Sequence, residues 1–472
     1  MLKCDLLVDS KDLRATLLRL KKDEDFTILL DMTAVDYSKF PDSTPSRFAV
    51  VYVLRSSDFK KETTVKAFVS DETLSIDTVC DIFPSANWAE REAYDQYGVI
   101  FLNHPNLKRV LNHKQFIGHP LRKDYKITQG QICTETEDLM DEMLPLLKSK
   151  GYTDEEIADL MLLNVGPSHP ASHGTIRNFV ALEGETIAAC VTEIGYLHRG
   201  FEKACEHHTY SQVIPYTDRL NYCSAILNNI GWAKAIEDMM KIEITPRAKM
   251  IRVVIGELSR IIDHFVCNAA NMVDLGGLTN FWYLFAPRDM AYDLLSKLTG
   301  ARLTNTYTRI GGLEFDLYDG FDKDLEEVLK TSEKAIEDVL SLIAHNKLFH
   351  DRTQDVGVIK ADFALANGIS GPNLRAAGVA HDLRKDKPYY GYENFDFDLV
   401  IGSHGDVYDR MMCRFEESIQ SIKIIRQAMK NMPDGAINVY APNLVLPNKK
   451  DVYGNIEGLM NQFMLTFEGT LV

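Results

Sequence analysis

The feature that most constrains the fold is a long amphipathic segment, residues 245–274. Thr245 followed by Pro246 is a helix start signal, because a threonine side chain caps free backbone N–H groups and proline is tolerated in the first turn. Apolar residues then recur at three- and four-residue spacing, which is typical of a helix that buries one face. The pattern ends at Asp274, just before a Gly-Gly pair. The segment predicts one long helix that packs within a helical domain.

The rest of the second half follows the same pattern. Helical periodicity predicts further helices at residues 218–241, 287–298, 325–349, 407–432 and 451–467, with Pro287 opening the second and Asp406 capping the fourth. Two strand-like runs at 177–184 and 186–195 predict a hairpin, and a Gly- and Pro-punctuated stretch at 357–406 predicts a long loop region. Residues 164–472 are therefore expected to form a mainly α-helical domain with minor β structure.

The N-terminal part has a different pattern. Residues 1–128 predict a small α/β domain, with helices at 12–20, 78–83 and 88–97 and strands at 48–54 and 63–69. Residues 129–163 are acidic and are broken by Pro145 and Gly151, as expected of a linker with some helical content. The predicted fold class is α+β: a small α/β domain, an acidic linker and a mainly α-helical domain.

Composition narrows the classes of function. The net charge of −16 repels phosphate and argues against a nucleic-acid partner. No apolar run reaches the roughly 18 residues that span a bilayer, so we expect membrane contact only through partners. The eight cysteines form no C-x-x-C motif, so no metal site is predicted. His207 and His208 beside Cys205 are more typical of a solvated helix end than of a metal site.

Three carboxylates, Glu90, Glu92 and Asp95, fall on one predicted helix among aromatic residues. Two interpretations are open: catalytic carboxylates, or a solvated helix that carries charge pairs and faces a partner. The second is favoured. The basic residues Arg122 and Lys123 of G-H-P-L-R-K-D-Y are interpreted in the same way, as contacts to a neighbouring protein.

The residues best suited to chemistry lie in the loop N-V-G-P-S-H-P-A-S-H-G, residues 164–174. Pro170 fixes its own φ and keeps His169 out of the helical region, so this loop has a defined shape. It presents two imidazoles, His169 and His173, ahead of a segment rich in Arg, His and Tyr that ends in T-D-R-L-N-Y. Two interpretations are open here as well: a proton-handling site, or histidines that cap turns by bonding to the backbone.

Several long motifs, in the same order, resemble one known family. E-I-G-Y-L-H-R-G-F-E, G-E-L-S-R-I-I-D-H-F, V-D-L-G-G and R-I-G-G resemble the D subunit of bacterial NADH–quinone oxidoreductase, respiratory complex I. W-A-E-R-E-A-Y-D-Q-Y-G-V-I-F and G-H-P-L-R-K-D-Y resemble the C subunit of the same complex. The match covers nearly the whole chain, which is thus similar to a fused C/D subunit. For the D part, the resemblance implies the fold of the nickel–iron hydrogenase large subunit without its metal cysteines.

The resemblance implies a quinone-reduction site. Quinone reduction takes two electrons and two protons, so each carbonyl oxygen needs a proton donor nearby. His173 and Tyr222 match the family's two ligands of the quinone headgroup, and Asp274 matches the acid that partners this histidine. His169 matches a residue that lines the same region. An acid at a helix C-terminus is otherwise unfavourable by up to about 1 kcal/mol, because it lies at the negative end of the helix dipole.

The resemblance also implies partners. The chain has no cysteine cluster, no G-x-G-x-x-G after a strand and no P-loop, so the sequence does not predict binding of flavin, nicotinamide or an iron–sulfur cluster. In this family the electrons come from an iron–sulfur cluster in the adjacent B subunit. Further expected partners are the I subunit and the H and A subunits in the membrane. The expected place is peripheral, on the cytoplasmic side of the bacterial inner membrane, in a proton-pumping NADH–quinone oxidoreductase.

Two alternatives stay open. The first is the large subunit of a hydrogenase-related complex. Such subunits hold nickel and iron with two C-x-x-C pairs, whereas this chain has only Cys223 at the matching first position. The second is a scaffold protein without redox chemistry, which rests on positions where this sequence differs from the family. Asn221 stands where Asp is usual, and His381 where Tyr is usual. The chain also stops at L-T-F-E-G-T-L-V, where the D subunit normally continues around the mouth of the quinone channel. We therefore expect a fragment, a separately supplied tail or an altered site.

Overall fold

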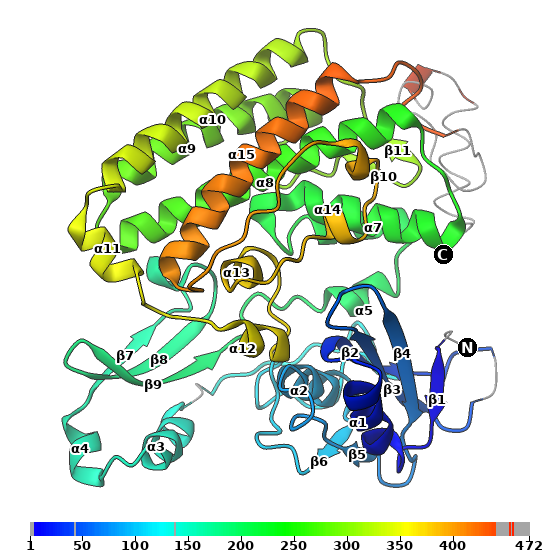
Figure 1. The fold of residues 1–472 in the computed structure, drawn as a ribbon. Coiled ribbons are helices and arrows are strands. Elements are labelled where there is room, and N and C mark those ends of the chain that lie inside the picture. Colours follow the sequence, from blue (N-terminus) through cyan, green and yellow to red (C-terminus); the bar gives the residue numbers. More distant parts are fainter. Residues whose placement is uncertain (1–3, 42–43, 136–137, 440–452, 455, 457–472) are drawn as a thin grey trace. The chain divides into compact units, whose positions relative to one another are not determined.

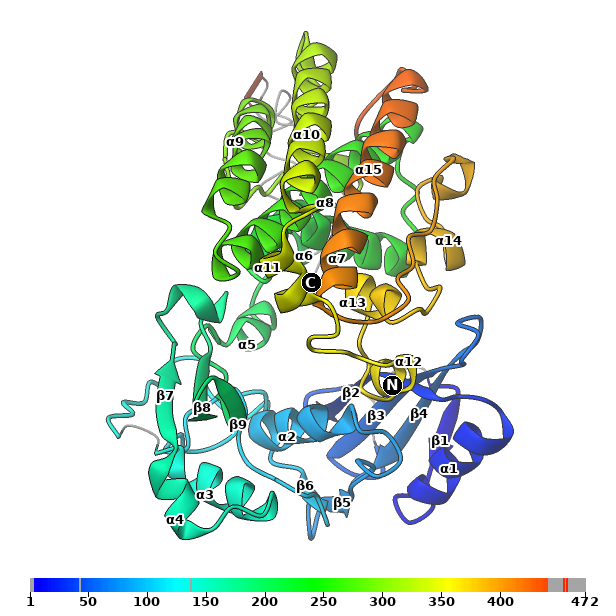
Figure 2. The ribbon, with the colours of Figure 1, turned by 60° about the vertical axis from the view of Figure 1, so that its left-hand side comes forward.

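The computed structural model describes residues 4–41, 44–135, 138–439, 453–454 and 456 (Figure 1). The chain divides into two compact units: Met1–Ala204 with Leu365–Gly368, and Cys205–Ala364 with Ile369–Val472. Sheets form the framework of the first unit, and long helices form that of the second (Figures 1 and 2). The predicted α+β fold class is confirmed. The predicted domain limits at residues 128 and 163 stay a prediction.

A four-stranded sheet with the order β1-β4-β3-β2 forms the centre of the first unit. Its strands are β1 (Leu6–Val8), β2 (Ile28–Asp36), β3 (Phe48–Arg55) and β4 (Glu62–Phe68). β1 runs parallel to β4, and the other pairs are antiparallel. The helices α1 (Leu13–Asp23) and α2 (Ala86–Tyr97) add apolar side chains, such as Leu17 and Ala93, to the same core. The strands and helices predicted at 12–20, 48–54, 63–69 and 88–97 are confirmed.

The helix predicted at residues 78–83 is wrong, because these residues form turns beside two short parallel strands, β5 (Ser75–Asp77) and β6 (Ile100–Leu102). The hydroxyl of Thr78 and the N–H of Val79 both donate to the buried carboxylate of Glu90. A side chain from α2 thus satisfies the polar groups at the start of these turns.

A second, antiparallel sheet with the order β7-β8-β9 follows in the first unit. It consists of β7 (Met161–Val165), β8 (Arg177–Glu183) and β9 (Thr186–Glu193), so the hairpin predicted at 177–195 is confirmed. The helix α3 (Met140–Ser149) packs against it through Met143 and Leu147. The helix α4 (Asp154–Asp159) starts with a capping box formed by Thr153 and Glu156.

One long buried helix, α8 (Pro246–Asp274), forms the centre of the second unit. The side chain of Thr245 accepts a hydrogen bond from the N–H of Ala248, which confirms the predicted start. The helices α7 (Ala225–Met240), α9 (Leu278–Thr299) and α15 (Val407–Lys430) pack against α8, and α10 (Phe321–Ile343) packs against α9. Because α8 has neighbours on several sides, it buries charged residues as well as apolar ones such as Phe265.

Shorter elements connect these helices. They are α5 (Phe201–Cys205), α6 (Tyr210–Thr217), α11 (Lys347–Thr353), α12 (Ala361–Ala366), α13 (Gly371–Ala376), α14 (Leu383–Asp386), β10 (Thr308–Arg309), β11 (Gly312–Leu313) and the 3-10 turns Pro170–Ser172, Tyr222–Ser224 and Tyr392–Asn394. The region predicted as a long loop, residues 357–406, contains only short helices of this kind. Among the helices of the described residues, none combines the length and apolar character that crossing a membrane requires.

Several helix ends differ from the prediction. Pro287 was expected to open α9, but it is buried inside this helix, which begins at Leu278. The helix predicted at 325–349 is two helices, because the side chain of Asn346 accepts from the N–H of Phe349 and caps a new one. The cap at Asp406 is confirmed.

The helix predicted at 218–241 begins only at residue 225, after the 3-10 turn Tyr222–Ser224. The helix predicted at 451–467 lies almost entirely outside the described residues.

Candidate functional site

The loop between β7 and β8 carries His169 and His173 on the first unit. Its base requires a glycine. Gly166 has φ +97°, and a Cβ built there would lie 1.9 Å from the carbonyl oxygen of Ile176. The two ends of the loop therefore approach each other more closely than any side chain would allow.

Ser172 holds this loop from inside. Its buried hydroxyl lies 2.6 and 2.7 Å from the carbonyl oxygens of His169 and Gly174, which share its one proton. Nδ1 of His169 accepts from the N–H of Ala171 at 3.2 Å, so the turn-capping interpretation is confirmed for this histidine. His173 follows in the left-handed region, with φ 50°, and is exposed. A non-glycine residue in this region is uncommon, and here it places an imidazole at the tip of a hydrogen-bonded turn.

Tyr222 begins a 3-10 turn that joins α6 to α7 in the second unit, and it is 43% exposed. The side-chain amide of Asn221 donates to the hydroxyl of Ser224 at 2.6 Å and closes the turn. An aspartate at position 221 would accept a bond from the same hydroxyl. Asn221, which stands where the family usually has aspartate, therefore closes the turn as an aspartate would.

Asp274 is the last residue of α8 and is exposed. The N–H groups of Gly276 and Gly277 bond to carbonyl oxygens in the last turn of α8, at 2.9 and 2.7 Å, which forms a Schellman cap. The guanidinium of Arg352 donates to the carbonyl oxygen of Leu275 at 3.2 Å. A cation at this end of the helix offsets part of the dipole that disfavours an acid there.

The predicted site residues are thus contributed by both units. His169 and His173 share one loop of the first unit, whereas Tyr222 and Asp274 belong to the second. All four are exposed on the unit that carries them. Their convergence on one quinone stays a prediction.

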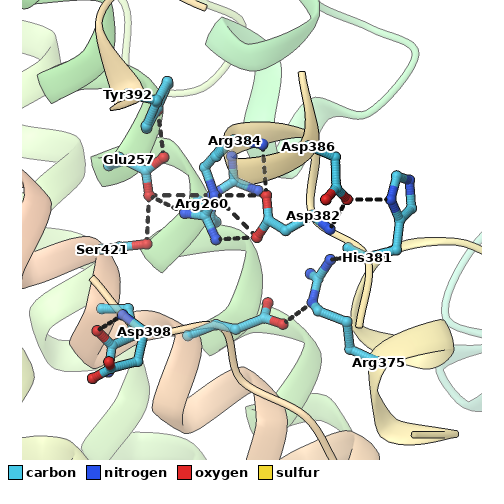
Figure 3. Close-up of polar contacts among 12 residues, drawn as sticks. Glu257, Arg260, Arg375, His381, Asp382, Arg384, Asp386, Tyr392, Asp398 and Ser421 are labelled. Atoms are coloured by element: carbon cyan, nitrogen blue, oxygen red, sulfur yellow. Dashed lines mark hydrogen bonds and ion pairs between the residues drawn. The ribbon is translucent and has the colours of Figure 1, made fainter. Parts of the chain in front are cut away.

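Figure 3 shows a buried ionic network in the second unit that the sequence analysis did not predict. Glu257 on α8 accepts from the hydroxyls of Tyr392 at 2.5 Å and Ser421 at 2.6 Å, and from Nη1 of Arg384 at 2.9 Å. Nε of Arg260 lies 3.2 Å away. Burial alone would raise the pKa of Glu257, but Arg260, Arg384 and the two hydroxyls together lower it to about 2.

The network continues from Arg384 to a second acid. Arg384 Nη2 donates to Asp382 at 2.7 Å, and Nε of the same guanidinium also faces this carboxylate. Although burial opposes it, Arg384 holds the pKa of Asp382 well below its usual range. One guanidinium thus joins two buried carboxylates, one from α8 and one from the start of α14.

A neighbouring part of the network contains the family departure at His381. Arg375 donates to Glu417 at 2.6 Å and to the carbonyl oxygen of His381 at 3.0 Å (Figure 3). Glu417 also lies 3.0 Å from Nε2 of His264. His381 Nδ1 lies 2.6 Å from Asp386. The histidine at position 381 is therefore paired with an acid of its own unit.

A second buried pair fixes the R-I-G-G turn. Arg252 is fully buried and bonds to both oxygens of Glu237, at 2.7 and 2.8 Å. It also donates to the carbonyl oxygens of Arg309 and Gly312, while Glu237 accepts from the N–H of Gly311. This ion pair therefore supplies the backbone bonds of the β10–β11 turn.

The sequence does contain a signal for these networks. Glu257 lies three residues after Val254 and four before Ile261, so it falls on the apolar face of the predicted helix. A charge at such a position must be paired once it is buried. Apart from Arg260, however, the partners of Glu257 come from segments more than a hundred residues away, and spacing along the chain does not identify them.

The interpretation of α2 as a solvated or partner-facing helix is wrong for two of its acids. Glu90 and Asp95 are fully buried. Asp95 accepts from the backbone N–H groups of residues 110–112, at 2.8 to 3.1 Å, and from Nη1 of Arg109 at 2.6 Å. The acid supplies hydrogen bonds that this irregular segment does not make within itself. Glu92 stays on the exposed face.

Arg122 makes contacts within its own unit, and its expected contact to a neighbouring protein stays a prediction. Its Nε donates to the carbonyl oxygen of Tyr97 at 2.6 Å, and its guanidinium lies 5.3 Å from the ring centre of Phe48. Arg122 therefore ties the 118–125 segment to its own unit. The partner contact expected of Lys123 stays a prediction.

Cys80, Glu90 and His104 bring potential metal ligands within 4.8 Å of one another. Nδ1 of His104 accepts from the N–H of Asn106 at 2.9 Å, so the ring proton belongs on Nε2, which faces the carbonyl oxygen of Asn87 at 3.1 Å. Burial also lowers the pKa of His104 and favours the neutral ring. The nitrogen that faces Glu90 therefore lacks the lone pair a metal needs, and the cluster is a satisfied hydrogen-bond network.

Known proteins match both parts of the chain. The family model described as respiratory-chain NADH dehydrogenase, 30 Kd subunit, matches residues 6–131, and the one for the 49 Kd subunit matches residues 274–472. The C/D subunit of an NADH-quinone oxidoreductase from Bdellovibrio bacteriovorus is 47% identical over 98% of this chain and 81% of its own length. The C/D subunits from Psychrobacter cryohalolentis and Psychrobacter arcticus are each 38% identical over 96% of this chain and 78% of their own lengths.

A small sheet domain of the 30 Kd type and a helical domain of the 49 Kd type on one chain define a fused subunit of a respiratory NADH dehydrogenase. More particularly, the chain belongs to the family of the C/D subunits of NADH-quinone oxidoreductase. It is a component of an oxidoreductase of respiratory electron transport, and the resemblance seen in the sequence is confirmed. Family membership favours this assignment over the hydrogenase alternative.

Proposed function

We propose that this chain forms the quinone-reduction site of a proton-pumping NADH–quinone oxidoreductase, jointly with the iron–sulfur B subunit. His173 and Tyr222 donate protons to the two carbonyl oxygens of the quinone, Asp274 partners His173, and His169 lines the same site. One observation carries the proposal. In a chain of the C/D family, both proton donors are exposed on short turns that internal hydrogen bonds hold in shape.

The quinone takes up two electrons and two protons, and each of its two carbonyl groups becomes a hydroxyl. Tyr222 releases its O–H proton to one oxygen and His173 releases an N–H proton to the other, because both groups are donors that can be reprotonated. Asp274 fixes the orientation of the imidazole. The electrons come from the iron–sulfur cluster that the family places in the B subunit, since the cysteines of this chain form no C-x-x-C motif.

The proposal includes an arrangement of the chain and its partners. Residues 1–128 act as a docking domain, residues 129–163 as a linker, and residues 164–472 as the quinone-site domain. The partners are the B and I subunits of the complex and the H and A subunits in the membrane. The chain is peripheral, on the cytoplasmic side of the bacterial inner membrane, and reaches the membrane through these partners.

The test uses the assembled complex with His173→Ala or Tyr222→Phe in this chain. Loss of a positioned proton donor lowers quinone reductase turnover by roughly 10²- to 10⁴-fold. NADH oxidation with ferricyanide, a soluble acceptor, stays at the wild-type rate, because it needs no quinone site. His345→Ala and Tyr152→Phe are matched controls, since neither residue is part of the proposed site. Full quinone turnover in both site variants would contradict the proposal.

A further inference from the structure

Asp218 is a fully buried acid four residues before Tyr222, directly after α6. Its Oδ2 accepts from the hydroxyl of Thr306 at 2.7 Å and lies 3.2 Å from Nη1 of Arg219. Its Oδ1 has no hydrogen-bond partner among the described residues. A buried carboxylate with an unsatisfied oxygen is unfavourable. An asparagine would accept the same bond from Thr306, so the property that distinguishes the aspartate is its ability to ionise.

The surroundings of Asp218 fix the start of the turn that carries Tyr222. The hydroxyl of Thr217 lies 2.9 Å from Oδ1 of the buried Asn229 on α7 and 2.8 Å from the carbonyl oxygen of Ile214, which share its one proton. The amide of Asn229 in turn donates to the carbonyl oxygen of Asn305. These bonds tie residues 217–218 to α7 and to the 305–306 segment. Residues 219–222 between this anchor and α7 are exposed, so the anchor decides where the tyrosine is held.

Arg219 couples the charge of Asp218 to this exposed turn. Among the described residues, Arg219 is the charged group that faces Asp218, whereas α7 contributes the neutral Asn229 and the 305–306 segment the neutral Thr306. Burial raises the pKa of Asp218, and the bond from Thr306 and the charge of Arg219 offset part of this rise. The ionised carboxylate attracts Arg219, and protonation removes the attraction.

We propose that Asp218 is a positioning residue for Tyr222: its ionised carboxylate holds Arg219, and with it the 219–222 turn, in the geometry that presents the tyrosine hydroxyl to the quinone. Protonation of Asp218 loosens the turn. The proposal rests on the role of Tyr222 proposed above. In this proposal, the protonation state of a buried acid controls the rate of quinone reduction.

The test measures kcat and KM for quinone in the assembled complex as a function of pH. Asp218→Asn removes the titrating group, so the decline of activity on the acid side that Asp218 causes disappears. Arg219→Gln removes the cation that lowers the pKa of Asp218, so the same decline moves to higher pH by roughly one unit. Asp238→Asn is the matched control, because Asp238 is an exposed acid on α7 that is paired with Lys234. It leaves the profile unchanged.

The outcomes separate this proposal from the one it rests on. A wild-type pH profile in both Asp218→Asn and Arg219→Gln, with Tyr222→Phe impaired, overturns the role of Asp218 alone. Full turnover in Tyr222→Phe overturns the role of Tyr222 on which this proposal rests. Should Asp218→Asn fail to assemble, as shown by lost ferricyanide activity, Arg219→Gln decides the question, because Arg219 is half exposed. A fall in kcat in this variant without a shift of the profile also counts against the proposal.

Discussion

Replacing Glu257 with glutamine tests how much the buried ionic network stabilises α8. The substitution keeps the shape of the side chain and removes the charge that Arg260 and Arg384 face. In the folded chain the pKa of Glu257 falls from its ordinary value of 4.5 to about 2, although burial acts in the opposite direction. At about 1.4 kcal/mol for each pH unit, this depression corresponds to about 3 kcal/mol at neutral pH. Removal of one partner of a buried ion pair costs about 3–5 kcal/mol in other proteins, and the value from the pKa shift agrees with this range.

The same pKa sets the pH dependence of the effect. Because the folded pKa of Glu257 is lower than the unfolded one, its stabilisation is fully present above the ordinary glutamate range. It is lost as the pH falls from about 4.5 towards about 2. The deficit of Glu257→Gln relative to the wild type is therefore largest at neutral pH and shrinks in acid.

Hydrogen exchange read by mass spectrometry measures this directly on peptides from α8. A loss of about 3 kcal/mol makes exchange through opening of this helix roughly 100-fold faster. Glu327→Gln is the control, since Glu327 lies on the exposed face of α10. Equal protection of α8 in the two variants, or a deficit that does not change between neutral and acid pH, would show that the charge of Glu257 does not stabilise this helix.

Three further substitutions probe the supports of the fold. Gly166→Ala forces a Cβ towards the carbonyl oxygen of Ile176, and we expect quinone reductase activity of the complex to fall roughly tenfold or more as the histidine loop shifts. Thr245→Ala removes the cap of α8 and costs about 1 kcal/mol, seen as faster exchange in the first turn of that helix. Asp36→Asn breaks the bidentate contact with Arg47, which holds the pKa of Asp36 well below its usual range although burial opposes it. Thermal unfolding shows a deficit of roughly 2–3 kcal/mol at neutral pH that shrinks below the ordinary aspartate pKa.

Elements with a local signal at their ends were predictable from the sequence. Thr245 with Pro246 starts α8, and Asp406 caps α15, because a capping side chain acts within its own turn. The predictions that failed concern segments whose structure depends on residues outside their own turn. Pro287 reads as a helix start, yet packing around α9 carries the helix through it. Residues 78–83 have helical spacing, but they form turns whose first polar groups bond to a carboxylate from α2.

The candidate site was found through resemblance to a family, and the residues alone left it open. The spacing of residues along a helix does not distinguish an exposed acid from a buried one that accepts bonds from a distant segment. The prediction for Asp95 was wrong for this reason. The same holds for Asp218, because no residue near it in the chain indicates that Thr306 is its partner. Charges that pair across the fold become visible only in three dimensions. Glu257, placed on the apolar face of its helix, is the exception.

In each unit, a buried polar group holds the exposed turn that carries a proposed proton donor. A donor that must meet a quinone has to be accessible, and accessible turns are the least rigid parts of a protein. Here each turn is held by a group that is itself buried: Ser172 beneath His173, and Thr217 with Asp218 before Tyr222. In the proposed role of His173 and Tyr222, such supports fix the side chains in advance, so that a site gains precision without burying its reactive atoms. Substituting a support should therefore lower turnover more than it lowers stability, whereas substituting Glu257 should do the reverse.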